Sequence, residues 1–125
     1  MAKTDFIKQF IDTTIDSSDG IHAVSVVEIA SGMSLGAFSD GVLDPDVASA
    51  YNVEVVKSKL KAIAALGLKE GIDDILITLE TQYHIINCTK KGTHMVYVAA
   101  DKKKANLALL RAVVNKGVKE IEEKI

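Results

Sequence analysis

The stretch DILITLETQYHIINCTKKGTHMVYVAADKKKANLALLR, from Asp74 to Arg111, decides the fold of this chain. It contains three short apolar runs separated by polar breaks, a pattern typical of consecutive β-strands. Thr89–Gly92 separates the last two runs and predicts a hairpin loop. A long helical pattern then opens at Asp101, which we expect to cap the final helix. This stretch therefore predicts three strands followed by a helix.

The residues before this stretch predict a helix and then a β-hairpin. Apolar residues at three- and four-residue spacing indicate a first helix over residues 6–15, which the Ser-Ser-Asp-Gly turn at 17–20 ends. Two strands follow, Ile21–Ile29 and Met33–Phe38. Small residues alternate along the second strand, which favours a weak strand at the edge of the sheet.

A second and a third helix complete the predicted order. Asp44 before Pro45 suits the start of a middle helix that runs to about Leu66, where Gly67 ends it. The apolar stripe of the final helix is Leu107, Leu110, Val114, Gly117, Val118, Ile121 and Ile125. The predicted fold is α+β, a largely antiparallel sheet in the order α-β-β-α-β-β-β-α. The strands Ile21–Ile29 and Met95–Ala100 are apolar at both parities, so we expect helices on both faces of the sheet.

The middle helix has two apolar faces, and one sheet accounts for only one of them. The face that we expect on the sheet holds Val53, Val56, Leu60, Ile63 and Ala64. The second face holds Tyr51, Val55, Ala62 and Leu66. A second copy of the chain is the simplest partner for it, although another helix or a loop of the same chain is an alternative. Asn52 and Lys59 divide the two apolar faces, and a polar strip of the same helix holds Glu54, Lys57, Ser58 and Lys61.

Length and composition indicate one domain, residues 1–125, of a cytoplasmic protein. A net charge of −2 with interspersed signs gives no basic field for nucleic acid, and the chain lacks Trp. One Cys cannot form an intrachain disulfide, which suits a reducing compartment. The N-terminal Met-Ala-Lys-Thr-Asp has no signal pattern, and no apolar run reaches the length of a membrane span.

The reactive-looking residues form no catalytic or metal-binding pattern. His84 and Cys88 would lie about 13 Å apart along one strand at ~3.3 Å per residue, too far for a nucleophile and its base. Cys88 is better explained as a small core residue. His22, His84 and His94 match no metal-ligand spacing. We therefore expect no catalytic residue, no bound metal and no cofactor, and a protein that is not an enzyme.

Three further polar motifs have structural explanations. Asp40, Asp44 and Asp46 do not match a calcium loop, and the glycines of residues 30–36 lead into a strand without a phosphate-binding lysine. Lys102–Lys104 would oppose the dipole of the helix that we expect to open at Asp101. Solubility explains these lysines, and an acidic partner or an anion is the functional alternative. Lys90 and Lys91 lie roughly 20 Å away by strand rise, so they do not enlarge this patch.

The order of elements and their residues resemble the roadblock / dynein light chain family. The matched residues are the Asp73-Asp74-Ile-Leu-Ile-Thr run, the Tyr83 strand, Gly92, the Met95–Ala100 strand and the run Ala105 to Arg111 after Asp101. The resemblance extends from about Gly20 to Val118. Ala108 stands where relatives often carry Gly after Asn-Leu.

The resemblance implies a five-stranded antiparallel sheet between helices and a dimer. The third strands of two subunits would pair along Ile75–Thr81, through Ile75, Ile77 and Leu79, and the middle helices Val47–Leu66 would lie side by side. The family's roles are non-catalytic: regulation of small Ras-like GTPases, or service as adaptor subunits. The polar strip on the middle helix would then bind the partner. An alternative function is a small-molecule sensor with a ligand between sheet and helices, which would need a pocket with convergent polar groups.

Overall fold

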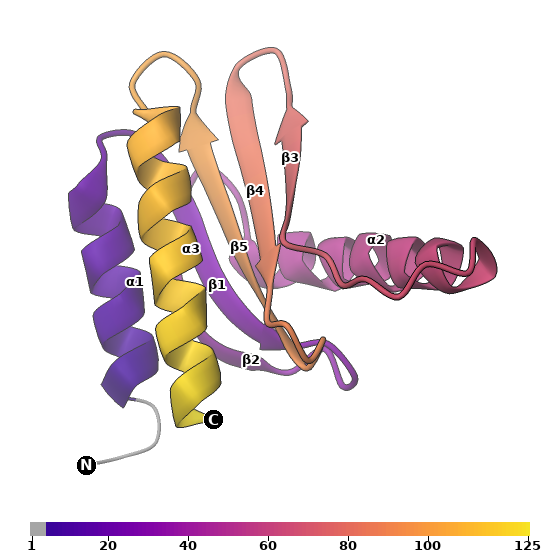
Figure 1. The fold of residues 1–125 in the computed structure, drawn as a ribbon. Helices are drawn as coiled ribbons and strands as arrows, with labels where there is room; N and C mark the ends of the chain where they lie inside the picture. Colours follow the sequence, from indigo (N-terminus) through magenta and orange to yellow (C-terminus); the bar gives the residue numbers. More distant parts are fainter. Residues whose placement is uncertain (1–4) are drawn as a thin grey trace.

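The computed structural model describes residues 5–125, and the interpretation of the N-terminal sequence for targeting lies mostly outside them. The elements are α1 (Asp5–Ser17), β1 (Ile21–Glu28), β2 (Ser34–Ser39), α2 (Pro45–Ala65), β3 (Asp74–Thr78), β4 (Gln82–Cys88), β5 (His94–Asp101) and α3 (Leu107–Lys124). This is the predicted α+β order (Figure 1).

One antiparallel sheet holds the five strands in the order β2-β1-β5-β4-β3. β2 and β3 are therefore its two edges. The edge position of β2 confirms the prediction made from its small residues. β3 pairs with β4 alone, with Ile75 opposite Ile86 and Ile77 opposite His84.

Helices cover both faces of the sheet, as the apolar strands predicted. α1 and α3 lie side by side on one face, where Phe10, Leu110, Val114 and Ile121 pack onto β1, β4 and β5 (Figure 1). α2 lies on the other face, where Val53 and Val56 pack around Tyr97 and Met95. Every residue from His94 to Ala100 is buried, because β5 is central and is covered from both sides.

α2 begins and ends where the sequence predicted. The Asp44 carboxylate accepts hydrogen bonds from the N–H groups of Asp46 and Val47, and Pro45 occupies the first helical turn. Gly67 takes a φ of 72°, which a residue with a side chain adopts only with strain. Figure 1 shows α2 crossing the sheet and extending beyond β3. The prediction that Ala64 packs on the sheet is wrong for this reason, since this part of α2 has no strand beneath it and Ala64 is exposed.

The start of the last helix also differs from the prediction. Asp101 ends β5, and its carboxylate accepts hydrogen bonds from the N–H groups of Lys103 and Lys104. Asn106 is the residue that caps α3, through a bond from the N–H of Leu109. Lys102–Lys104 form the turn before the helix, so they do not oppose its dipole.

Two further boundaries were predicted too generously. β3 ends at Thr78, and Leu79–Thr81 form the turn into β4 instead of continuing the edge. Ile125 was placed on the buried stripe of α3, but it follows the last turn and is 56% exposed. The inner members of that stripe, from Leu110 to Ile121, are buried as predicted.

Candidate functional site

The side of α2 that faces away from the sheet carries exposed apolar side chains. Tyr51 is 75% exposed, Val55 40% and Leu66 69%, while Ala62 is half-buried. Among residues 5–125, neither another helix nor a loop covers these side chains, so the alternative of cover from within the chain is wrong for the described residues. An exposed apolar stripe along a helix is costly unless a partner buries it.

The polar strip predicted to bind a partner lies beside this stripe. Glu54, Ser58 and Lys61 are exposed, and Lys57 is half-buried. A shallow depression brings members of the two sets together, and its lining is Glu54, Val55, Ser58, Lys59 and Ala62. The predicted dimer stripe and the predicted partner strip are therefore neighbours on one continuous surface.

The free edge of β3 is the second part of the candidate interface. Ile75 and Ile77 are half-buried and point to the face that carries α2, because they pair with Ile86 and His84 on that face. Leu79, in the turn that follows, is 43% exposed. α2 packs mainly over β2, β1 and β5, which leaves the β3 end of this face only partly covered.

An ion pair that the sequence analysis did not predict connects β3, at this edge, to α3 on the other face of the sheet. Nη2 of Arg111 in α3 lies 2.6 Å from Oδ2 of Asp74, and Nε donates to the same oxygen at 3.2 Å. The two residues are 37 positions apart. Neither has a local sequence signal, because only the fold brings them together: α3 packs on β4 and β5, and β3 is the strand next to β4.

His84 lies on the α2 face beside the β3 edge. Its Nδ1 is 3.2 Å from the hydroxyl of Tyr97 and its Nε2 is 2.8 Å from Oε1 of Gln82. The rings of His84 and Tyr97 meet edge to face, with centroids 5.4 Å apart. Burial is the main cause that lowers the pKa of His84, and the charge of His22 lowers it further.

Cys88 is a buried side chain on the same face as His84. It is 8% exposed and packs with Met95 and Tyr97. Burial raises the pKa of its thiol to about 11, so the thiol stays protonated near neutral pH and is a poor nucleophile. These observations support the interpretation of Cys88 as a core residue.

The three histidines are separated in the fold. Nδ1 of His22 donates to Oδ2 of Asp40 at 2.8 Å, and that bond is the main cause that lowers the pKa of Asp40. His94 lies at the other end of the sheet and contacts the hydroxyl of Thr93. Within residues 5–125, no group of three His, Cys, Asp or Glu side chains is arranged to hold a metal ion.

None of the helices in the described part of the chain has the length and apolar character needed to cross a bilayer.

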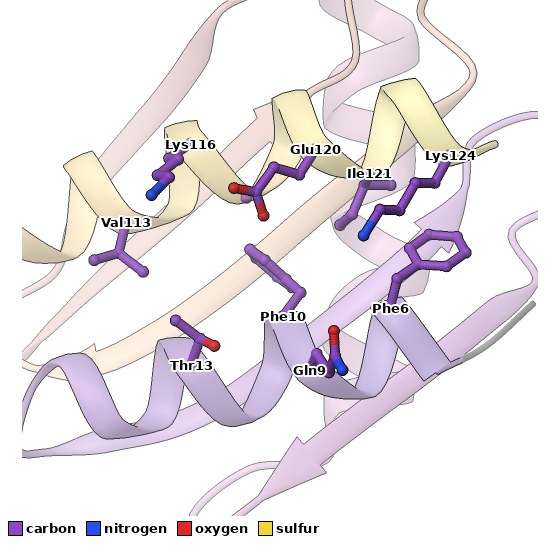
Figure 2. Close-up of a pocket in the computed structure, with 10 residues that line it drawn as sticks. Phe6, Gln9, Phe10, Thr13, Val113, Lys116, Glu120, Ile121 and Lys124 are labelled. Carbon is purple, nitrogen blue, oxygen red and sulfur yellow. The ribbon is translucent and has the colours of Figure 1, made fainter. Parts of the chain in front are cut away.

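A groove of about 360 Å³ runs between α1 and α3 on the opposite face (Figure 2). Phe6, Phe10 and Ile121 form its apolar part, and Glu120 and Lys124 flank it. Nζ of Lys124 lies 5.9 Å from the centroid of the Phe6 ring, so the protein's own cation covers that ring. The mixed charges along this groove do not define a ligand.

Comparison with known proteins relates the chain through its structure only. No family model matches the sequence, and no curated protein is significantly similar to it. A Roadblock/LC7 domain from Streptomyces avermitilis superposes with a TM-score of 0.77 at 14% identity, covering 92% of this chain and 93% of that one. MglB of Myxococcus xanthus gives 0.82 at 12% identity, covering 95% and 94%.

A third solved structure agrees with these two. The gliding protein MglB from Thermus thermophilus gives a TM-score of 0.79 at 10% identity, over 100% of this chain and 94% of that one. Such coverage shows a likeness of the whole domain, while the low identities limit the conclusion to the fold. The likeness concerns a fold with three helices and one five-stranded antiparallel sheet, in the order α-β-β-α-β-β-β-α. The chain therefore has the roadblock fold.

Proposed function

We propose that this chain is a non-catalytic, dimeric regulatory or scaffolding module, and that a small Ras-like GTPase is the class of partner it regulates. One observation carries the proposal. The stripe of Tyr51, Val55 and Leu66 on α2 is exposed, and the edge of the sheet at β3, on the α2 side of the molecule, is open as well. The solved structures with this fold include MglB and MglC of Myxococcus xanthus, and one MglB structure is described as a tetrameric arrangement.

Dimerisation through β3 would bury both surfaces at once. Pairing of two β3 strands about a two-fold axis extends the sheet to a second copy and satisfies the free backbone groups of the edge. The same axis places the partner's α2 on the same face of the extended sheet. Because α2 extends beyond β3, the two helices would meet, with Val55 and Ala62 in the seam.

The paired helices would form the docking platform for a further protein. Glu54, Ser58 and Lys61 would appear twice, once on each side of the two-fold axis. Charged groups of both signs orient a partner and raise its rate of association, while apolar neighbours supply most of the affinity.

The test uses the small Ras-like GTPases encoded by the same organism, each loaded with GDP or with a GTP analogue. Binding to the purified chain and its effect on GTP hydrolysis and nucleotide exchange are measured. Lys57→Glu combined with Lys61→Glu should weaken binding and leave the dimer intact. The matched control, Lys102→Glu with Lys103→Glu, changes the same charge in a turn far from α2 and should bind normally. Failure of every such GTPase to bind in either nucleotide state would contradict the GTPase part of the proposal.

A further inference from the structure

A second cleft, of about 460 Å³, lies on the side of α2 away from the exposed stripe. It is bounded by the C-terminal half of α2, by residues 68–72 of the irregular segment after α2 and by the turn between β4 and β5. Its size lies within the range of small-molecule sites. The apolar side chains of its wall are Ile29, Leu60, Ile63, Leu68, Ile72 and Cys88.

The cleft exists because α2 extends past the sheet. Leu60 is half-buried at the sheet border, while Ile63 and Ala64 follow where no strand supports the helix. The chain returns through a segment without regular structure, in which Leu68 is 48% exposed. Apolar side chains in the walls of this concave site therefore remain in contact with water. An apolar group of a ligand would cover them.

Three lysines are among the residues that line this cleft. Lys69, Lys90 and Lys91 line it together with a single acidic residue, Glu70. Within residues 5–125 the ion pairs are His22–Asp40 and Arg111–Asp74, so none of the three lysines has a carboxylate partner. This excess of positive charge is complementary to an anion.

A carboxylate beside the cleft, that of Glu122 on α3, is engaged by backbone groups. Oε1 and Oε2 of Glu122 accept hydrogen bonds from the N–H groups of Lys90 and Lys91, each at 3.0 Å. These two bonds are the main causes that lower the pKa of Glu122. They fix the β4–β5 turn against α3. The charges of Lys90 and Lys91 also lower the pKa of Glu122, but among residues 5–125 neither ammonium group forms an ion pair with a carboxylate.

We propose that this cleft binds a small amphipathic anion, a carboxylate with an acyl tail. The tail would lie against Ile63 and Ile72, and the carboxylate would lie near Lys69, Lys90 and Lys91. Such binding is separate from the proposed dimer, because Val55 and Tyr51 lie on the other side of α2 from Leu60. The site would give the module a second input that does not depend on its protein partner.

Two variants separate the tail contact from the charge contact. Gly71 has no positive φ, and a Cβ there would meet Lys90 O at an ordinary 3.6 Å, so the backbone at residue 71 accepts a side chain. Because Gly71 lines the cleft, we expect the side chain of Gly71→Leu to fill part of it. Lys90→Gln with Lys91→Gln removes two charges and keeps the backbone bonds to Glu122. Lys102→Gln with Lys103→Gln is the matched control, at the opposite end of β5.

The experiment titrates the protein with octanoate, octanol and acetate and follows the backbone amides by NMR. Octanoate should bind saturably, with one site per chain, and shift the amides of the cleft. Gly71→Leu should abolish binding, and the Lys90/Lys91 variant should weaken it roughly five- to tenfold, as expected for the loss of two exposed ion pairs. Octanol should bind more weakly than octanoate, acetate should not bind, and the Lys102/Lys103 control should behave as wild type.

Several results would overturn the proposal. Equal affinity for octanol and octanoate would show that the lysines do not recognise the anion. Octanoate shifts that persist in Gly71→Leu would place the binding elsewhere, and unsaturable shifts would mean that no site exists. Binding of an acidic peptide without any binding of octanoate would assign the cleft to a protein partner instead. Val55→Glu, which tests the dimer, should leave octanoate binding unchanged.

Discussion

The aromatic ring of Phe10 in α1 lies against Gly117 in α3 so closely that a Cβ at residue 117 would overlap two of the ring carbons. A glycine inside a helix costs about 1 kcal/mol relative to alanine. Here it allows α1 and α3 to approach each other over the sheet, with Phe10 only 7% exposed.

Gly117→Ala should therefore destabilise the protein even though alanine is the better helix former. Forcing extra atoms into a packed site costs about 1–3 kcal/mol, which exceeds the gain in helix propensity of about 1 kcal/mol. We expect a net loss of roughly 1 kcal/mol in the free energy of unfolding, measured by urea denaturation. Asn115→Ala, at an exposed position two residues earlier, is the control and should be neutral or slightly stabilising. A stabilised Gly117→Ala would show that the Phe10 ring moves aside freely.

His84 should make the stability depend on pH. Because burial lowers its pKa, the unfolded chain takes up the proton at a higher pH than the folded chain does. Stability from this source is full above the unfolded pKa of about 6.5 and falls as the pH drops through it. Urea unfolding at pH 7.5 and 5.5 should show that fall in wild type. His84→Gln should reduce it, and an identical fall in the variant would assign the pH dependence to other groups.

The ion pair between Arg111 and Asp74 should matter more for local order than for global stability. Both side chains are partly exposed, and exposed pairs contribute about 0–1 kcal/mol. Arg111→Ala should therefore change the free energy of unfolding by less than about 1 kcal/mol. Amide hydrogen exchange in β3 should become faster, because the ion pair adds to the pairing with β4 and to the core packing of Ile75 and Leu76 that hold the strand. Unchanged exchange from Asp74 to Thr78 would show that pairing with β4 is sufficient.

The sequence predicted the fold where the pattern depended on periodicity. Met95–Ala100, apolar at every position, indicated a central strand covered on both faces, and the small residues of 33–38 indicated an edge. Asp44 and Pro45 gave the start of α2 because a helix cap depends on adjacent residues. The resemblance to the roadblock family implied the same order of elements. The structural comparisons confirm the roadblock fold.

The remaining differences come from effects that periodicity does not contain. Asp101 has the chemistry of a cap, but its carboxylate serves a turn that precedes the helix, and Asn106 takes the role. Ala64 has the right helical phase for the sheet, but the sheet ends before it. The cleft near Lys90 depends on how far α2 extends past β3, which no local pattern records. The residues of the predicted dimer seam and partner strip stay predictions.

The central claim is that two copies associate through the β3 edge and the α2 stripe, and the molar mass in solution tests it most directly. Light scattering after gel filtration at tens of micromolar should give twice the chain mass of 13.4 kDa for wild type. Val55→Glu should give a monomer or aggregate, since a charge buried in the seam without a partner costs several kcal/mol. Lys119→Glu, on exposed α3, should remain dimeric. A wild-type mass of one chain, or a Val55→Glu variant that stays a stable dimer, would contradict the claim.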